Sequence, residues 1–110
     1  MIENIEYIVE KDFEGELVIL EKLDLNNIKN IPLNSVIYLK RPTPDIVLLF
    51  GKINGVIIDV GGKLSHFAII CRESNIGVVK FSKASENLLN NDYITIKDGK
   101  INVRRNWKTL

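Results

Sequence analysis

The residues best suited to chemistry lie close together near the middle of the chain. Gly61 and Gly62 are followed by Ser65 and His66, and Arg72 lies further along the same stretch. His66 is the single histidine of the sequence, and imidazole is a good nucleophile at neutral pH. An apolar run precedes the glycines and a second apolar run follows the histidine. This order is typical of a strand, a tight turn and a capped helix, and it predicts that His66 accepts a phosphoryl group.

The expected position of His66 at the start of a helix supports this chemistry. The unpaired N–H groups and partial positive charge of a helix N-terminus favour a neutral, nucleophilic imidazole and attract an anionic phosphoryl group. Gly61 and Gly62 permit a tight turn and let a phosphorylated donor approach the backbone. Ser65 either caps the helix or donates its hydroxyl to a phosphoryl oxygen. Arg72, less than two helical turns onward, is placed to neutralise phosphate if it reaches back.

Each of these residues also has a purely structural explanation. A lone histidine is more often structural than catalytic, and glycine pairs are common where a strand turns into a helix. Ser65 would cap the helix in either case, and Arg72 could pair with Glu73 or Asp59. Only the combination in one stretch favours phosphoryl chemistry. Cys71, with apolar neighbours at helical spacing, is expected to be a small core residue.

The elements that must position His66 follow from the apolar pattern. Strands are expected at residues 5–9, 17–20, 36–39, 56–60 and 78–81, and a polar segment at 11–15 suits a hairpin or loop between the first two. Residues 24–29 are expected to form a short helix or a turn. Helices are expected at residues 65–74 and 82–90, the latter with Leu88 and Leu89 facing inward. Residues 46–50 read as a short helix capped by Thr43, with a strand as the alternative. Asp98 and Gly99 predict a closing hairpin between residues 93–97 and 100–103.

These elements define a mixed α/β fold. Residues 1–110 form one domain, because no linker, repeat or low-complexity segment interrupts them. Hairpins at both ends argue against a purely parallel sheet. The central helix begins at the His66 motif.

Composition excludes several classes of function. With 45% hydrophobic and 26% charged residues the chain is an ordinary folded protein, and its net charge of +1 gives no basic face for nucleic acid. The Arg104–Arg105 pair beside Trp107 is expected to be a solvated tail. One cysteine and one histidine allow neither a disulfide nor a metal cluster. The sequence shows no signal peptide and no apolar run of transmembrane length, so a cytoplasmic protein without membrane contact is expected.

The stretch around His66 resembles the mobile, phosphohistidine-carrying domain of the phosphoenolpyruvate-utilising enzymes. This family includes pyruvate phosphate dikinase, phosphoenolpyruvate synthase, the first enzyme of the bacterial sugar phosphotransferase system and rifampin phosphotransferase. The positions that match the family pattern are Gly61, Gly62, Ser65, His66, Ala68, Ile69, Arg72 and Glu73, and the upstream turn is matched by Thr43, Pro44 and Asp45. The resemblance extends from about Leu17 to Val103.

The resemblance implies a compact swivelling domain of β/β/α architecture that carries phosphoryl groups. His66 would be phosphorylated transiently and would shuttle phosphate between a nucleotide site and a phosphoenolpyruvate or pyruvate site on partner domains. Gly61, Gly62, Ser65, Arg72 and Thr43 would support the phosphoryl group. This domain itself would bind no cofactor or metal, while Mg²⁺, ATP and phosphoenolpyruvate would bind to the partners. The chain would be either a separate carrier subunit or a piece of a longer protein.

Some positions depart from the family pattern and leave a second function open. Leu64 stands where many members have threonine, and Phe67 replaces a small residue and is expected to narrow access to His66. Asn75 and Gly77 replace the usual glycine and proline. The alternative is a binding or regulatory module that keeps the swivelling fold but has lost phosphotransfer. A buried His66 is expected in that case.

Overall fold

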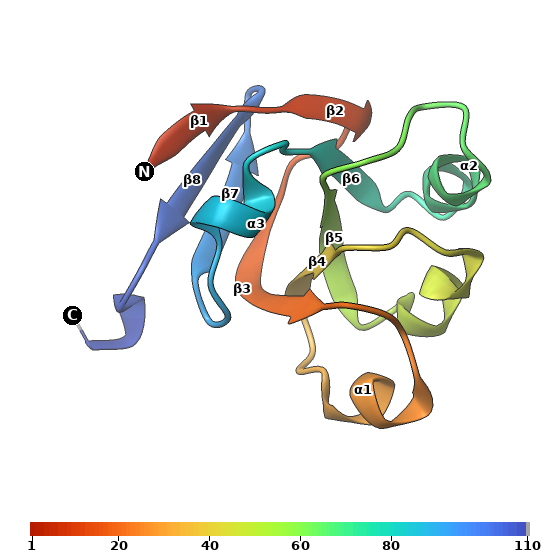
Figure 1. Ribbon diagram of the computed structural model, residues 1–110, viewed down its shortest axis with the longest axis horizontal. Helices are drawn as coiled ribbons and strands as arrows, with labels where there is room; N and C mark the ends of the chain where they lie inside the picture. The colour runs from red at the N-terminus through yellow and green to blue at the C-terminus, as the bar shows by residue number, and fades with distance from the viewer. Residues whose placement is uncertain (110) are drawn as a thin grey trace.

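The computed structural model describes residues 1–109 and shows a mixed α/β fold (Figure 1). Its strands are β1 (Ile2–Asn4), β2 (Glu6–Val9), β3 (Phe13–Leu20), β4 (Ser35–Leu39), β5 (Ile53–Ile58), β6 (Gly77–Lys80), β7 (Tyr93–Lys97) and β8 (Lys100–Arg104). Its helices are α1 (Leu25–Asn30), α2 (His66–Glu73) and α3 (Ala84–Asn87), and its 3₁₀ helices are η1 (Pro44–Leu49) and η2 (Trp107–Thr109).

The strands form a hydrogen-bonded sheet in the order β1-β8-β7-β3-β4-β5-β6-β2. The four central strands β3, β4, β5 and β6 are parallel, whereas β2 on one side and β7, β8 and β1 on the other pair antiparallel. The long strand β3 belongs to both halves, because residues 13–16 pair with β7 and residues 17–20 pair with β4. The antiparallel half can therefore fold over one face of the parallel half.

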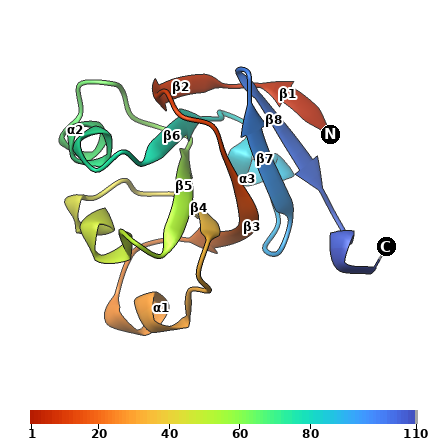
Figure 2. The same ribbon diagram turned by 180° about the vertical axis from the view of Figure 1, so that it is seen from behind.

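The result is a three-layer β/β/α arrangement with two hydrophobic cores. In β4, Ile37 and Leu39 lie in the core shared with α2 and η1, while Val36 and Tyr38 lie in the core shared with β7, β8 and α3. This alternation is what a strand buried on both faces requires. Seen from behind, α1, η1 and α2 lie to one side of the parallel strands, and β7 and β8 lie to the other (Figure 2). The predicted α/β swivelling architecture is confirmed.

The predicted hairpin at the N-terminal end is wrong. Strand β2 pairs with β6 at the far edge of the sheet, and β3 pairs with β4 and β7. Gly15, predicted as part of a turn, lies within β3, where a side chain would collide with the carbonyl of Asn34. The alternation of residues marks a strand but carries no information about its partner. Burial of Ile8 and Val9 against the helical layer decides the pairing instead.

Two of the shorter predicted helices need comment. Residues 44–49 are helical rather than extended, with Thr43 as the N-cap, although the helix is of the 3₁₀ type. The helix predicted at residues 82–90 is reduced to α3 (Ala84–Asn87). Leu88 is buried as expected, but Leu89 is 56% exposed and the prediction for it is wrong. The backbone becomes extended at Leu88, which turns the next side chain outward.

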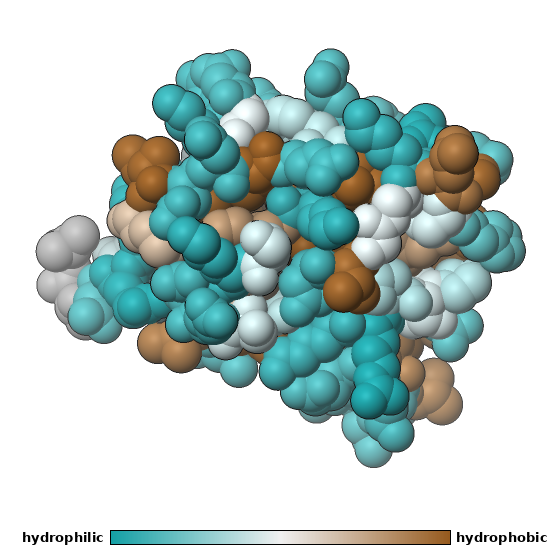
Figure 3. Space-filling view, turned by 45° about the horizontal axis from the view of Figure 1, so that its top comes forward, coloured by the Kyte–Doolittle hydropathy of each residue, from teal (hydrophilic) through white to brown (hydrophobic). Residues whose placement is uncertain are grey.

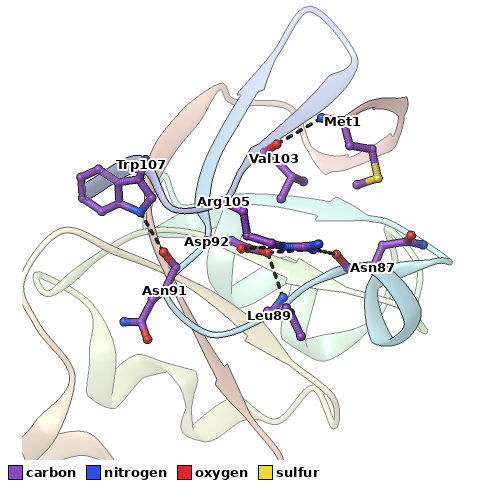
Figure 4. A network of polar contacts seen from close by, with 8 residues as sticks. All are labelled: Met1, Asn87, Leu89, Asn91, Asp92, Val103, Arg105 and Trp107. Carbon is purple, nitrogen blue, oxygen red and sulfur yellow. Dashed lines mark hydrogen bonds and ion pairs between the residues drawn. The ribbon is translucent and has the colours of Figure 1, made fainter. Parts of the chain in front are cut away.

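The C-terminal segment is also not the solvated tail that the sequence suggested. Arg105 Nε lies 3.0 Å from Oδ1 of Asp92, a carboxylate that is only 1% exposed, and Trp107 donates its indole N–H to the carbonyl of Asn91. Figure 4 shows how these contacts fasten the segment after β8 to the loop before β7.

The hairpin between β7 and β8 forms as predicted, with Asp98 and Gly99 at positive φ. Within residues 1–109 no helix is long and apolar enough to cross a membrane.

Candidate functional site

The site lies on the loop between the carboxyl end of β5 and the start of α2. Ser65 is the N-cap of α2: its Oγ accepts from the N–H of Ala68 at 3.1 Å and donates to the carbonyl of Gly62 at 2.9 Å. The N–H of Ser65 also donates to the carbonyl of Gly62 at 3.2 Å. The sequence left two roles open for this hydroxyl: capping the helix or donating to a phosphoryl oxygen. In the structure it caps the helix, and its proton is already donated to Gly62.

His66 is the first residue of α2, and its side chain is exposed. Its ring makes no hydrogen bond with any residue that the structure describes. The N–H groups of the first helical turn point toward the same end of the helix. Gly62 lies beside open space, since an added side-chain carbon would meet nothing within 4 Å, and Gly61 has a φ of +124° that requires glycine. The histidine ring is thus accessible from outside the domain.

Arg72 reaches back along α2 to the glycine loop. Its Nη2 donates to the carbonyl of Lys63 at 3.2 Å and to the carbonyl of Ile8 at 3.1 Å. It forms no ion pair with Glu73 or Asp59, the two partners that a structural role suggested. The guanidinium therefore brings a positive charge to the loop before His66.

A pair of residues beneath the loop was not found by sequence reasoning. The hydroxyl of Tyr38, in β4, donates to Oδ2 of Asp59 at 2.7 Å. Burial of the phenol and its hydrogen bond to Asp59 raise the pKa of Tyr38 well above its usual value. Asp59 directly follows β5, so the bond fixes the point at which the chain leaves the sheet. The sequence offers only a weak signal, because β4, which holds Tyr38, and β5, which ends just before Asp59, become neighbours only in the fold.

Thr43 lies apart from the loop in sequence but on a neighbouring element. Its Oγ1 accepts from the N–H of Asp45 at 3.3 Å and so caps η1, which packs against α2. No hydrogen bond joins Thr43 to His66 or the glycine loop among the described residues. The structure thus brings Gly61, Gly62, Ser65, His66 and Arg72 together and places Thr43 on the adjacent helix.

The departures from the family pattern have clear locations. Leu64 is 89% exposed, whereas Phe67 is only 4% exposed and packs in the core. The expectation that Phe67 narrows access to His66 is therefore wrong, because successive helical residues point in different directions. Cys71 is buried as predicted, and burial raises the pKa of its thiol to about 12.

Several exposed apolar side chains lie on the glycine loop, on α2 and on η1, which packs against α2. Leu64 and Val60 are exposed on the loop, Ile69 on α2, and Val47 and Leu48 on η1. On the face shown in Figure 3 hydrophilic residues predominate and apolar ones appear as separate spots.

In the part of the chain that the structure describes, no group of three or more His, Cys, Asp or Glu side chains could hold a metal ion.

The fold and the loop together define a small swivelling-type domain that presents one histidine at a helix N-terminus. The profile of the family described as "PEP-utilising enzyme, mobile domain" matches residues 31–100, which is more than half of the chain. The chain therefore belongs to the mobile-domain family of the phosphoenolpyruvate-utilising enzymes.

Curated relatives agree with this assignment. The chain is 39% identical over 83 residues to an uncharacterized phosphotransferase, YvkC, of Bacillus subtilis, a match that covers 73% of the chain and 10% of that protein. It is 31% identical over 83 residues to a probable phosphoenolpyruvate synthase of Pyrococcus horikoshii, covering 74% of the chain and 10% of the relative. The chain thus spans about a tenth of the length of these relatives.

Solved structures share the fold. An Enzyme I (nEIt) structure superimposes with a TM-score of 0.58 at 24% identity, over 76% of this chain and 36% of that one. Aconitase X of Thermococcus kodakaraensis superimposes with a TM-score of 0.70 at 12% identity, over 96% of this chain and 99% of that one. At these identities the likeness shows a common fold and nothing about the reaction.

Proposed function

We propose that this chain is the phosphoryl-carrying domain of a phosphoenolpyruvate-utilising phosphotransferase, with His66 as the residue that is phosphorylated. The observation that carries the proposal is the exposed imidazole of His66, unbonded to any described residue, at the N-cap end of α2 behind a glycine turn. Membership of the mobile-domain family supplies the chemical context.

In the proposed reaction a ring nitrogen of neutral His66 attacks the phosphorus of a bound donor. An N–P bond forms while the P–O bond to the leaving group breaks, and the leaving group departs with the electron pair. That group is a nucleotide when ATP is the donor, or the enolate of pyruvate when phosphoenolpyruvate is the donor. The N–H groups of the first turn of α2 and the charge of Arg72 favour the anionic phosphoryl group once it is bound. Transfer to the second site reverses these bond changes.

The partners in this proposal are a nucleotide-binding domain and a phosphoenolpyruvate- or pyruvate-binding domain of the same system. They would hold Mg²⁺ and the small-molecule substrates, and the reaction would take place in the cytoplasm. The much greater length of the relatives supports the idea that such partners exist. Exposed Leu64 and Val60 on the loop, and Leu48 on η1, which packs against α2, are suited to contact a partner that closes over His66.

The exposure of His66 also favours transfer over the alternative of a binding or regulatory module that has lost it. That alternative leads us to expect a histidine sealed in the core, with no room at its ring nitrogens.

The proposal is tested by incubating the chain with labelled ATP or phosphoenolpyruvate and the partner domains of its own system. We expect an acid-labile, base-stable phosphoryl label on wild-type protein and none on the His66→Ala variant, which should fold normally because the side chain is exposed. Ser74→Ala, an exposed change at the other end of α2, serves as the control and should keep the label. Label retained in His66→Ala, or absent from wild type, would contradict the proposal.

A further inference from the structure

One nitrogen atom of Arg72 holds three separate segments together. Arg72 lies on α2. Its Nη2 donates to the carbonyl of Lys63, in the middle of the glycine loop, and to the carbonyl of Ile8, on β2. The residues it joins are 9 and 64 positions away in sequence. A charged donor makes stronger hydrogen bonds to carbonyl groups than a neutral donor does, so these contacts hold the segments firmly.

The acceptor on β2 is available because of a local irregularity in the sheet. Tyr7 pairs with Val79 and Val9 pairs with Val78, so the register shifts at Ile8 between them. An extra residue at such a bulge is left out of the regular ladder of backbone hydrogen bonds. The side chain of Ile8 is 3% exposed and anchors the strand, while its carbonyl accepts from Arg72. The bulge therefore supplies a fixed point to which the loop can be tied.

The loop needs such a tie because little else holds it. Gly61, Gly62, Lys63 and Leu64 are all exposed, and Leu64 at 89% exposure packs on almost nothing. The Ser65 cap fixes the helical end of the loop through Gly62, and Asp59 is fixed at the sheet end through Tyr38. The bond from Arg72 to Lys63 holds the part of the loop between these points.

We propose that Arg72 is a positioning residue, which fixes the glycine loop by tying the carbonyl of Lys63 to the bulge of β2. Holding the loop is then the main role of Arg72, and attraction of its positive charge to the phosphoryl group is the secondary one. Strand β2 becomes part of the site, although it lies outside residues 31–100 that match the family profile. The inference rests on the proposed function only in assuming that the loop is held for phosphoryl transfer at His66. The hydrogen bonds of Arg72 to Lys63 and Ile8 are present without any phosphoryl group.

The test is made on the unphosphorylated chain, where attraction to phosphate cannot contribute. Arg72→Met keeps most of the side-chain length and removes the donors. The N–H of Ser65, bonded to Gly62, reports opening of the loop. We expect its hydrogen exchange to become about tenfold faster, the effect of losing a charged hydrogen bond. We also expect altered chemical shifts at Lys63 and Leu64.

Lys11→Met is the matched control. Nζ of Lys11 donates to the carbonyl of Asn75 at 2.8 Å, so it also joins the N-terminal segment, through a cation and a carbonyl, to the residues just after α2. This bond lies at the far end of α2 and does not touch the loop, so Ser65 exchange should stay as in wild type. If Arg72→Met does not fold, Arg72→Lys replaces it. The shorter lysine side chain places its ammonium group farther from the two carbonyls and should loosen the loop less.

The proposal is overturned if Arg72→Met leaves Ser65 exchange unchanged, or if Lys11→Met changes it equally. Labelling of His66 by ATP or phosphoenolpyruvate with the partner domains, the test of the proposed function, separates this inference from it. An unlabelled wild type with a loosened Arg72→Met loop refutes only the proposed function. A labelled wild type with an unchanged Arg72→Met loop refutes only the role of Arg72.

Discussion

At the scale of single residues, the Ser65 hydroxyl shows how one side chain serves both the helix and the loop. It accepts from the N–H of Ala68, which has no partner within α2, and it donates to the carbonyl of Gly62, the second glycine of the turn. The same hydroxyl therefore determines where α2 begins and how the loop approaches it. Because His66 follows directly, its placement depends on this cap.

We predict that Ser65→Ala lowers the free energy of unfolding by about 1 kcal/mol, the usual cost of losing an N-cap. Ser65→Thr keeps the hydroxyl and should lie close to wild type. Urea denaturation measures both, with the exposed Ser74→Ala as the control, which should change stability by less than about 0.5 kcal/mol. Equal losses in Ser65→Ala and Ser74→Ala would contradict the capping role.

At the scale of elements, Phe13 explains two glycines in the central strands. Gly55 of β5 and Gly77 of β6 are paired neighbours, and the ring of Phe13 from β3 lies over both. A side-chain carbon on Gly77 would lie 2.8 Å from that ring and 2.7 Å from the carbonyl of Lys11. The departure from the family's usual proline at position 77 thus has a packing reason.

We predict that Gly55→Ala destabilises the protein by about 1–3 kcal/mol, because the new methyl group displaces the Phe13 ring. In a Phe13→Ala background, itself less stable by about 3–5 kcal/mol, the added cost should fall below about 0.5 kcal/mol. A double-mutant cycle by chemical denaturation measures this coupling. Gly62→Ala, where nothing lies within 4 Å, is the control for stability. The same cost for Gly55→Ala in both backgrounds would refute the explanation.

At the scale of the whole molecule, the two ends of the described chain are fastened to the same side of the sheet. The amino group of Met1 donates to the carbonyl of Val103, and Arg105 bonds Asp92 and the carbonyl of Asn87 (Figure 4). Both contacts lie on the antiparallel half, away from the helical layer that carries His66. The site layer and the fastened ends are therefore on opposite faces of the parallel strands (Figures 1 and 2).

We predict that Arg105→Ala costs about 2 kcal/mol, since Asp92 is 1% exposed and keeps only the N–H of Leu89 as a donor. Arg104→Ala should cost less than about 1 kcal/mol, because that side chain is exposed and lies over the Tyr93 ring at 5.0 Å. Thermal and urea unfolding measure the difference. The labelling of His66 should stay the same in both variants. Similar losses of stability in the two variants would show that the Asp92 contact has no special importance.

Much of this protein follows from local sequence alone. Short-range patterns determined the strand at residues 36–39, residues 78–80 of the strand expected at 78–81, the cap at Ser65, the hairpin at Asp98 and Gly99, and the helix that begins at His66. Each of these depends on neighbours within a few residues. The spacing of Gly61, Gly62, Ser65, His66 and Arg72 was likewise enough to locate the candidate site and to indicate the family.

Only the tertiary structure decided which distant segments meet. The pairing of β2 with β6, the burial of Phe67, the Tyr38–Asp59 bond and the docking of Arg105 all join residues far apart in sequence. Periodicity specifies which face of an element is apolar, but it does not specify the element against which that face packs. The free energy of burying the whole core makes that choice. For this reason the sequence located His66 and Arg72, whereas the fold revealed that Arg72 is tied to Ile8.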